Sequence, residues 1–556
     1  MDAFADDARS LAGGTEGAAA LRSLTGVVLD ALEGGAARRG GPLPPGGPGA
    51  VAERVRAVLG APGGGVGGAG AVLPELGTGA VEALSSLVGL AAEGAADPAD
   101  PLCAAHLHCP PLAVAAAADL SASVLNPSMD SWDQAPAASE LEAWTCRALA
   151  GLVYGEGSGG DAGADALVTT GGTESNQLGV LLARELYGRD VRVVYGANAH
   201  HSVPRAAWLL GLPEPVRVPA PRGVLGPAEL REALGSLDAG RPGVPVLVVA
   251  TAGTTDTGAI DPLDELADVV GGFGPRSARG GGGGARLHVD AAYGGMLLFS
   301  RGRRARLAGL ERADSVTLDL HKLGWQPVAA GLFVVPDRRA LGPLDHRADY
   351  LNADDDTAAG LPDLLGRSLR TSRRPDIFKV AVTLRALGRA GLGALVEQTC
   401  EVASRLAELV EAEPRLELFG PPALSTVLFR PVGADAGAVA AVRRRLLVEG
   451  RAVLGRAAVS RGAAVSRGGG GQGTGGRDEL WLKATLLNPH AEDSDLRALL
   501  KLVLEALPSS AGCRPERPTP APPLPASRSG SPPALTESAS DTTPVTASSA
   551  ARSPRS

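Results

Sequence analysis

Hydrophobic residues in the middle of the chain form short runs that alternate with amphipathic stretches. The runs are rich in Val, Leu and Ala, which is typical of buried strands, and they lie at 166–170, 191–196, 215–220 and 245–251. The stretches between them carry apolar residues at helical spacing, at 177–188, 204–211 and 261–272. Strands that alternate with helices predict an α/β fold, with a mostly parallel sheet covered by helices on both faces.

A second set of elements follows in the C-terminal third. The pattern predicts helices at 380–399, 403–412 and 436–450, and strands at 424–431 and 479–489. Near the other end, Ala- and Leu-rich helical patches at 18–32 and 51–59 are separated by Gly and Pro. We therefore expect an N-terminal helical segment (1–125), a large domain (126–375), a smaller C-terminal α/β domain (376–508) and a disordered tail rich in Pro, Ser and Thr (509–556).

Composition narrows the class of protein. With 556 residues, 44% of them hydrophobic, the chain can bury a large core. A formal net charge of −8, without a basic patch interleaved with aromatics, argues against nucleic-acid binding. Signal-peptide and membrane-spanning patterns are not found, and the 5 cysteines form no CxxC pair. We expect a soluble cytoplasmic protein that binds neither membrane nor nucleic acid.

Two residues are candidates for a catalytic or ligand-binding site because each follows a short strand-like run. Asp290 ends LHVD and Lys322 follows DSVTLDLH, so both are expected at the edge of the sheet where α/β proteins bind ligands. A buried lysine can lose its proton and bond to a carbonyl carbon, and a fixed carboxylate can keep a proton on a pyridine nitrogen. Either residue alone would more simply be a turn cap or a surface lysine. Together they indicate pyridoxal phosphate (PLP).

The segments HVDAAYGG and DLHKLGW resemble the group II PLP-dependent amino-acid decarboxylases, which act on aromatic amino acids, glutamate, lysine or 2,4-diaminobutyrate. The resemblance runs from about His106 to Pro489. It implies the aspartate-aminotransferase-like fold (PLP fold type I), and a homodimer in which the N-terminal helices of each chain pack onto the partner subunit. It also implies that Lys322 carries the cofactor and that Asp290 faces the ring nitrogen.

Further cofactor contacts come from the same resemblance. The turn GGTES lies between a strand and a helix, where glycines and free N–H groups suit an anion, although such turns are common. The family pattern assigns the phosphate to Gly172, Thr173 and Glu174. It also places Thr251, Ala292 and His321 beside the cofactor. Asp319 stands where aromatic decarboxylases have Asn, and its role is left open.

A histidine pair follows the strand at 191–196. In the context A-H-x-S the family histidine stacks on the pyridine ring, which maps to His200; we expect His201 to be structural. His106 and His108 lie on alternate residues, but without a third ligand they do not indicate a metal. We expect no metal site, and we place His106 in the wall of the substrate pocket.

The segment NPSMDSWDQAPAASELE resembles family sequence that lines the active site, partly across the dimer interface. The sequence of this segment is most similar to that of the diaminobutyrate decarboxylases and the siderophore-pathway lysine decarboxylases. A substrate with a distal ammonium needs a carboxylate partner. We expect Asp130 or Asp133 to supply it; a solvated turn is the alternative.

These features predict a PLP-dependent L-amino-acid α-decarboxylase whose substrate is a small diamino acid, L-2,4-diaminobutyrate before lysine or ornithine. Three alternatives remain: decarboxylation of an aromatic or acidic amino acid, transamination, and a non-catalytic homologue. Tyr350 is the only tyrosine in the expected mobile loop and aligns poorly with the family's proton donor, which leaves that donor open. The glycine insertion at 275–286 and the repeat-containing segment 456–476 are expected to be surface loops.

Overall fold

The computed structural model describes most of the chain. The residues that it describes are 11–14, 16–60, 72–155, 163–273, 284–345, 355, 358–362, 364–459 and 479–507. They belong to one compact unit, Met1–Pro508. Tyr350, the predicted tail and most of both predicted loops lie outside the described residues, but the last residues of the glycine insertion begin a strand.

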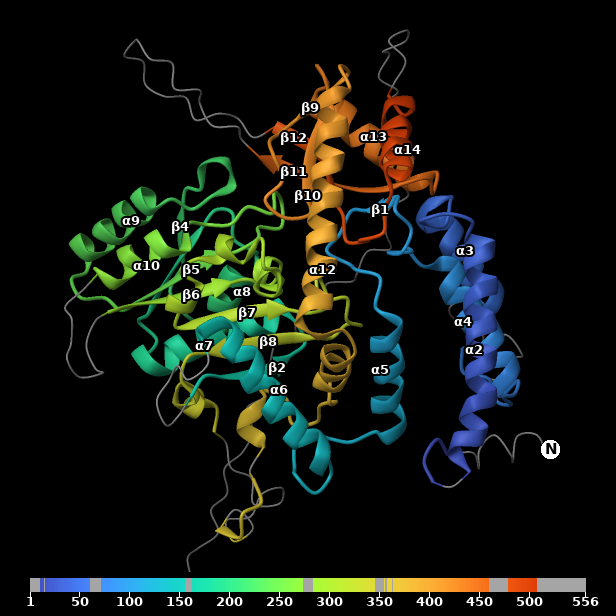
Figure 1. The fold of residues 1–556 in the computed structure, drawn as a ribbon, viewed down its shortest axis with the longest axis horizontal. Helices are drawn as coiled ribbons and strands as arrows, with labels where there is room; N and C mark the ends of the chain where they lie inside the picture. Colours follow the sequence, from blue (N-terminus) through green and yellow to red (C-terminus); the bar gives the residue numbers. More distant parts are fainter. Residues whose placement is uncertain are drawn as a thin grey trace, which may run out of the picture. The chain divides into compact units, whose positions relative to one another are not determined.

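A sheet of seven strands forms the centre of the large domain (Figure 1). Its strands are β2 (Asp165–Thr169), β3 (Arg192–Gly196), β4 (Val216–Val218), β5 (Val246–Thr251), β6 (Ala285–Asp290), β7 (Ser315–Asp319) and β8 (Gly331–Val335). The order across the sheet is β2-β8-β7-β6-β5-β3-β4, and β8 runs antiparallel to both its neighbours while the other pairs are parallel. The predicted mostly parallel sheet is confirmed.

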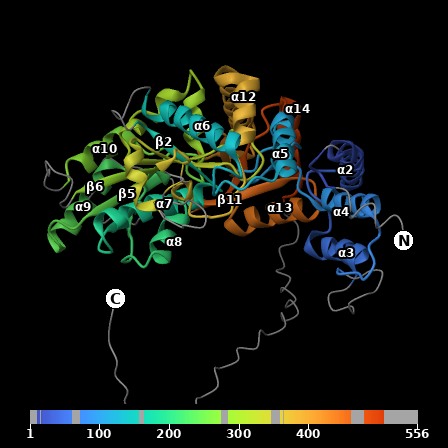
Figure 2. The same cartoon turned by 90° about the horizontal axis from the view of Figure 1, so that it is seen from below.

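Four strands of this sheet, β2, β3, β5 and β8, contribute side chains to two hydrophobic cores. In β5, Val246 and Val248 belong to one core, whereas Leu247 and Val249 belong to another. Successive side chains point to opposite faces, so a strand that lies between two apolar cores has apolar residues in succession, as β5 does. The helices α7 (Gly172–Tyr187) and α8 (Ser202–Leu209) cover one face, and α6 (Pro136–Tyr154), α9 (Pro227–Gly240) and α10 (Leu263–Gly271) cover the other. Figure 2 shows α7 and α8 on one side of the strands and α6 and α10 on the other.

A smaller, mostly antiparallel sheet carries the C-terminal part. It contains β1 (Cys103–Ala104), β9 (Leu416–Leu418), β10 (Thr426–Pro431), β11 (Val453–Val459) and β12 (Glu479–Thr485) in the order β1-β11-β12-β10-β9. The helices α13 (Ala436–Val448) and α14 (Asp493–Glu505) pack with it. The short β1 comes from the predicted N-terminal segment and pairs with β11.

The long helix α12 (Ile377–Ala412) corrects one expectation. Two helices, at 380–399 and 403–412, were expected, but no break separates them. The residues between them, 400–402, include no Gly or Pro that would end a helix, and Cys400 and Val402 are buried in the core. The break lies instead at Gly388, where φ is 65° and ψ is 179°. Glycine adopts positive φ without a steric penalty, so it can interrupt the helix there.

The N-terminal helices are α2 (Gly17–Arg39), α3 (Gly47–Leu59), α4 (Ala80–Gly94) and α5 (Ala113–Leu125). Gly35 of α2 lies so close to α4 that a Cβ there would come within 2.5 Å of the carbonyl oxygen of Gly89. The predicted helical patches at 18–32 and 51–59 lie in α2 and α3 and are confirmed.

Shorter 3₁₀ segments are η2 (Pro221–Gly223), η3 (Gly294–Phe299), η4 (Arg304–Leu307), η5 (Leu310–Arg312), η6 (Arg338–Leu344) and η7 (Leu365–Arg367). Among the described helices, none is both long and apolar enough for a membrane span.

Candidate active site

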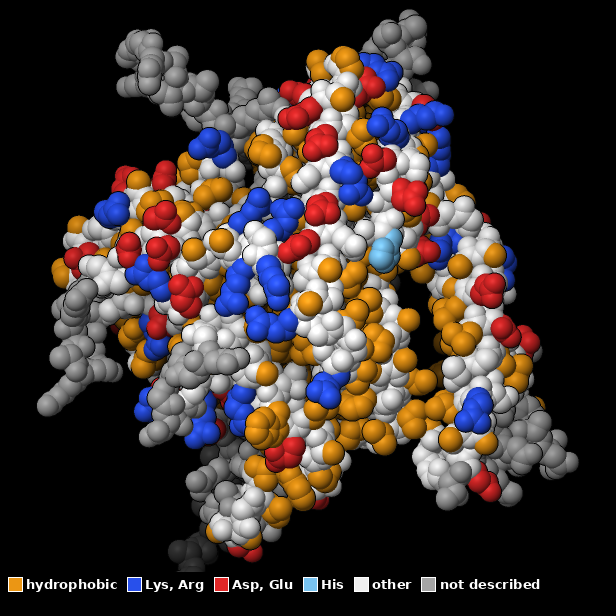
Figure 3. All heavy atoms as spheres, viewed as in Figure 1, with side chains coloured by type: hydrophobic (Ala, Val, Ile, Leu, Met, Phe, Trp, Pro, Cys, Tyr) orange, Lys and Arg blue, Asp and Glu red, His pale blue; other side chains and the backbone are white. Residues whose placement is uncertain are grey.

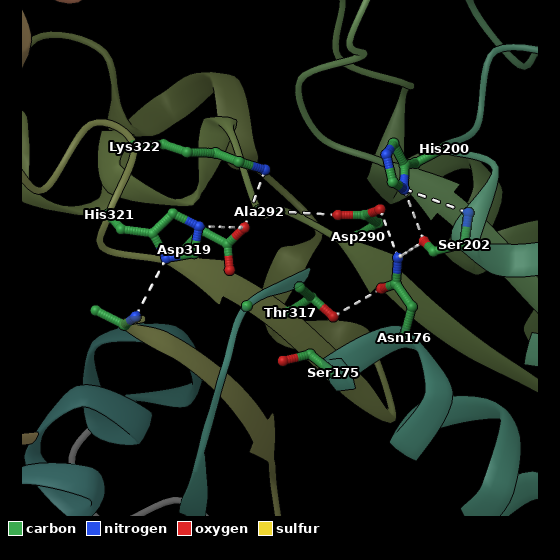
Figure 4. A network of polar contacts seen from close by, with 12 residues as sticks. Ser175, Asn176, His200, Ser202, Asp290, Ala292, Thr317, Asp319, His321 and Lys322 are labelled. Carbon is green, nitrogen blue, oxygen red and sulfur yellow. Dashed lines mark hydrogen bonds and ion pairs between the residues drawn. The ribbon is translucent and has the colours of Figure 1, made fainter. Parts of the chain in front are cut away.

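The ends of several strands meet at one cavity of about 360 Å³. The chain leaves β2, β3, β5, β6 and β7 at the same edge of the large sheet, as the pairing directions require. Eight predicted residues line the cavity: Gly172, Thr173, His200, Thr251, Asp290, Ala292, His321 and Lys322. It is also lined by Leu107, Thr170, Gly171, Gly253, Thr255, Tyr293 and Asp319. Figure 4 shows the polar contacts made by His200, Asp290, Asp319, His321 and Lys322.

Lys322 lies in the turn after β7 and pairs with the carboxylate of Asp319. Lys322 Nζ is 2.9 Å from Asp319 Oδ2, and the Asp319 side chain is buried. His321 Nε2 lies 3.6 Å from the same oxygen, and the Ala330 N–H donates to His321 Nδ1 at 3.2 Å. Burial lowers the pKa of His321. A neutral His321 therefore has its proton on Nε2, on the side of Asp319.

Asp290 ends β6 and is held by two neutral donors. Its Oδ2 accepts a hydrogen bond from Asn176 Nδ2 at 2.8 Å, and its Oδ1 accepts one from the Ala292 N–H at 3.1 Å. Its side chain is buried and lines the cavity. The carboxylate is thus fixed in orientation, and neither of these two donors carries a positive charge.

His200 lies in the loop after β3, at the cavity wall. Its Nδ1 is 2.8 Å from Ser202 Oγ and accepts from the Ser202 N–H at 3.3 Å. Burial lowers the pKa of His200, although the charge of Asp290 acts in the opposite direction. The ring is therefore neutral at pH 7. His201, expected to be structural, is exposed at the N-terminus of α8 and does not line the cavity.

The glycine turn before α7 has no room for larger residues. A Cβ on Gly172 would lie 3.0 Å from Ala292 Cβ and 3.2 Å from Asp319 Oδ2, and one on Gly171 would lie 2.9 Å from His321 Cε1. The first N–H groups of a helix lack partners within the helix, so this turn offers donors and a positive dipole end to an anion.

Glu174 has a different position from the other predicted cofactor contacts. Its carboxylate accepts from both the N–H and the hydroxyl of Thr170 at 2.7 Å, and it does not line the cavity. The side chain therefore stabilises the turn from the outside, and a contact with the cofactor remains a prediction.

The hydrogen-bond donors and acceptors of the cavity match the functional groups of PLP. The amine of Lys322 suits the aldehyde, Asp290 suits a protonated ring nitrogen, and the start of α7 suits the phosphate. In the described part of the chain, Thr251 Oγ1 and Asp319 Oδ1 are buried polar atoms without a hydrogen-bond partner. A polar group in the cavity would satisfy such atoms, since an unpaired buried polar atom is costly.

Three predicted substrate contacts do not line this cavity. Asp130 is buried and accepts from Gln134 Nε2 at 2.9 Å, while Asp133 is exposed. His106 lies in a bend after β1, and its neighbour Leu107 lines the cavity instead. Their part in substrate binding remains a prediction. Within the described ranges, no group of three or more His, Cys, Asp or Glu side chains is arranged to hold a metal.

Four residues that hold the site together were missed from the sequence: Asn176, Ser202, His288 and Thr317. All four are buried. A small polar residue near the start of a helix that follows a motif, as Asn176 and Ser202 are, was the available signal. It is weak because many such residues only cap helices.

The comparisons with known proteins agree with this site. A sequence model of the family described as "Pyridoxal-dependent decarboxylase conserved domain" matches residues 94–432. L-2,4-diaminobutyrate decarboxylase of Rhizobium meliloti (strain 1021) is 44% identical over 342 residues, which cover 60% of this chain and 66% of that protein. The enzyme of the same name from Acinetobacter baumannii is 34% identical over 357 residues, covering 59% and 66%. These matches thus span just under two thirds of the relatives' length.

Solved structures extend the likeness over most of the chain. The glutamate decarboxylase domain of diaminobutyrate-pyruvate transaminase and L-2,4-diaminobutyrate decarboxylase from Vibrio parahaemolyticus superposes with a TM-score of 0.73 at 28% identity, covering 89% of this chain and 97% of that one. Rice (Oryza sativa) TDC, solved with PLP and tryptamine, has a TM-score of 0.72 at 23% identity, covering 87% and 97%, and shows the shared fold. The chain belongs to the pyridoxal-dependent decarboxylase family, whose cofactor is pyridoxal phosphate.

Proposed function

We propose that this protein is an α-decarboxylase of L-amino acids that releases CO2 and an amine, and that its substrate is a diamino acid such as L-2,4-diaminobutyrate. One observation carries the reaction: the amine of Lys322, the carboxylate of Asp290 and the ring of His200 line a single cavity. The names of two relatives support the substrate class.

Each residue has a distinct task in this proposal. Lys322 holds the cofactor through its amine, and when bound, PLP supplies the electron sink that makes loss of CO2 possible. The carboxylate of Asp290 stabilises positive charge at the ring nitrogen. The neutral ring of His200 would contact the bound cofactor from the cavity wall, and the amine of Lys322 can carry a proton within the cavity.

The test is CO2 release from purified protein with PLP across a panel of diamino, aromatic and acidic amino acids. We expect activity with diamino acids and a visible absorbance band of the bound cofactor. Lys322→Ala should abolish the band and lower kcat/KM at least about 1,000-fold, at the level of losing a major catalytic group. Lys501→Ala, whose side chain is 77% exposed, is the matched control. Formation of a 2-oxo acid without CO2 release would favour transamination, and an inactive, colourless wild-type protein would favour a non-catalytic homologue.

The substrate assignment depends on a second subunit. Since Asp130 and Asp133 do not line the cavity of their own chain, we infer that a homodimer brings one of them to the partner's cavity. Exposed apolar side chains support such an interface: α5 exposes Leu120 and Leu125, the latter 72% accessible. Figure 3 shows hydrophobic side chains gathered over α5. Exposed apolar clusters of this kind mark interaction sites.

A complementation experiment tests the exchange between subunits. Asp130→Asn and Asp133→Asn should each be compared with wild type in kcat/KM for 2,4-diaminobutyrate, and the one that contacts the ammonium should lose about 10- to 100-fold. That variant is then mixed and refolded with Lys322→Ala. Only a dimer that shares the site regains activity, because one of its two cavities has both intact residues. Wild-type kcat/KM in both Asn variants would refute the ammonium contact.

A cytoplasmic location is also proposed. Cys103, Cys109, Cys146 and Cys400 are free thiols in the described part of the chain, which suits a reducing compartment.

A further inference from the structure

A single side-chain amide connects the two residues that flank the proposed cofactor ring. Asn176 lies in the first turns of α7 and is 1% exposed. Its Nδ2 donates to Asp290 Oδ2 at 2.8 Å and to Ser202 Oγ at 2.9 Å. Its Oδ1 accepts from Thr317 Oγ1 at 2.9 Å and lies 3.0 Å from His288 Nε2. Figure 4 shows Asn176 between Asp290, Ser202 and Thr317.

The orientation of this amide follows from its partners. An ionised carboxylate can only accept hydrogen bonds, so the atom that faces Asp290 must be the NH2 group of Asn176. Its carbonyl oxygen then faces His288 and Thr317, which must both donate. All four hydrogen-bonding positions of the amide are thereby used, and a flipped amide would set two acceptors against each other at Asp290.

A neutral His288 can donate to Asn176 Oδ1 in only one tautomer, the one with the proton on Nε2. Its ring is completely buried, and burial lowers its pKa to about 4, so it is neutral at pH 7. With the proton on Nε2, its Nδ1 must accept, and Ser315 Oγ lies 2.8 Å away to donate. The strand residues behind Asn176 therefore fix the amide in one orientation.

The same logic reaches His200 through Ser202. Because Ser202 Oγ accepts from Asn176, its own proton is free to go to His200 Nδ1, 2.8 Å away. The Ser202 N–H also donates to Nδ1, at the longer distance of 3.3 Å, so both donors favour an unprotonated Nδ1 and the shorter hydroxyl contact is the stronger of the two. A neutral His200 must then have its proton on Nε2.

We propose that Asn176 is a positioning residue that sets the hydrogen-bond polarity on both sides of the ring site: it keeps the Asp290 carboxylate as an acceptor, and through Ser202 it keeps His200 in the Nε2–H form. The proposal rests on the proposed function for the tasks of Asp290 and His200. It names a residue that contacts neither the cavity nor, by inference, the substrate.

The first test measures the tautomer of His200 without cofactor or substrate. Solid-state ¹⁵N NMR of histidine-labelled protein, with the His200 signals assigned by their loss in His200→Gln, should show Nδ1 unprotonated and Nε2 protonated. In Asn176→Asp the new carboxylate takes the Ser202 hydroxyl proton, so a population with the proton on Nδ1 should appear. Ser202→Ala removes the same donor without adding charge and should have the same effect. Ser175→Ala is the matched control. Ser175 is next to Asn176 in α7, and the variant loses only a hydrogen bond to Thr169, so it should keep the wild-type tautomer.

The second test is kinetic. Asn176→Asp should lower kcat about 10- to 100-fold with KM nearly unchanged, the size seen when a residue that orients an active-site group is lost. Protonation on Nδ1 in the wild type, or a wild-type tautomer in both Asn176→Asp and Ser202→Ala, overturns the proposal. The proposed function fails on a different result, the absence of CO2 release from wild-type protein with PLP, and the tautomer measurement is independent of it.

Discussion

Two buried aspartates end neighbouring parallel strands, and they differ in what surrounds them. Asp290 ends β6 and accepts hydrogen bonds from an amide and a backbone N–H. Asp319 ends β7 and pairs with the amine of Lys322, while its Oδ1 is a buried atom with no partner among the described residues. Neutral donors orient a carboxylate without neutralising it, so Asp290 retains its charge for an external cation. The charge of Asp319 is already matched within the chain. Position at a strand end therefore does not decide the task of a carboxylate, whereas its donors do.

Of the two aspartates, Asp290 should have the larger effect on catalysis when its charge is removed. Asp290→Asn keeps the size of the side chain but takes away the negative charge opposite the proposed ring nitrogen. We expect kcat to fall about 100- to 1,000-fold, the range for losing one preorganised electrostatic contact in an active site. Steady-state kinetics with 2,4-diaminobutyrate measure it. A loss of less than tenfold would contradict the assigned task of Asp290.

His288, which supports the Asp290 side through Asn176, should make stability depend on pH. Burial lowers its pKa from 6.5 to about 4, so between these values the unfolded chain binds a proton that the folded chain does not. Stability from this group is complete above pH 6.5 and is lost as the pH falls, by about 2 kcal/mol between pH 7 and pH 5. Urea unfolding at both pH values measures it.

The comparison with His288→Asn isolates this contribution from those of other titrating groups. The variant should lose about 2 kcal/mol less than wild type between pH 7 and pH 5. An equal loss in both proteins would show that His288 is protonated in the folded state. The exposed His490→Asn is the matched control.

Asp319→Asn should have a smaller effect on catalysis than Asp290→Asn. Asp319→Asn removes an ion pair with Lys322 but leaves Asp290 and its donors intact. We expect cofactor retention and a change in kcat/KM of about tenfold or less, because the Asn side chain keeps an oxygen that can accept a hydrogen bond from Lys322 Nζ. Cofactor absorbance and steady-state kinetics measure this. A loss as large as that of Asp290→Asn would mean that the two carboxylates share one task.

The sequence was informative where a residue's position follows from its own strand. The apolar runs before Asp290 and Lys322 place both at strand ends, and the structure has them there. Helix boundaries were less certain: the expected break after residue 399 was wrong because α12 continues through it, and the interruption is at Gly388.

Partners that come from distant parts of the chain were not predictable. Asn176 and Asp290 are 114 residues apart, and their contact exists because α7 packs across the strands β6 and β7. Hydrophobic periodicity does not reveal a buried amide. A single polar residue changes the helical pattern in the same way whether its side chain is buried or exposed.

By itself the sequence determined the order of strands and helices, the apolar faces that bury the sheet and the reactive groups that follow its strands, because local spacing decides which side chains can leave water together. Only the tertiary structure decided which donors surround each carboxylate and which nitrogen of His200 is protonated. Those features depend on distances of about 3 Å between segments that chain folding brings together, and no local pattern encodes such distances.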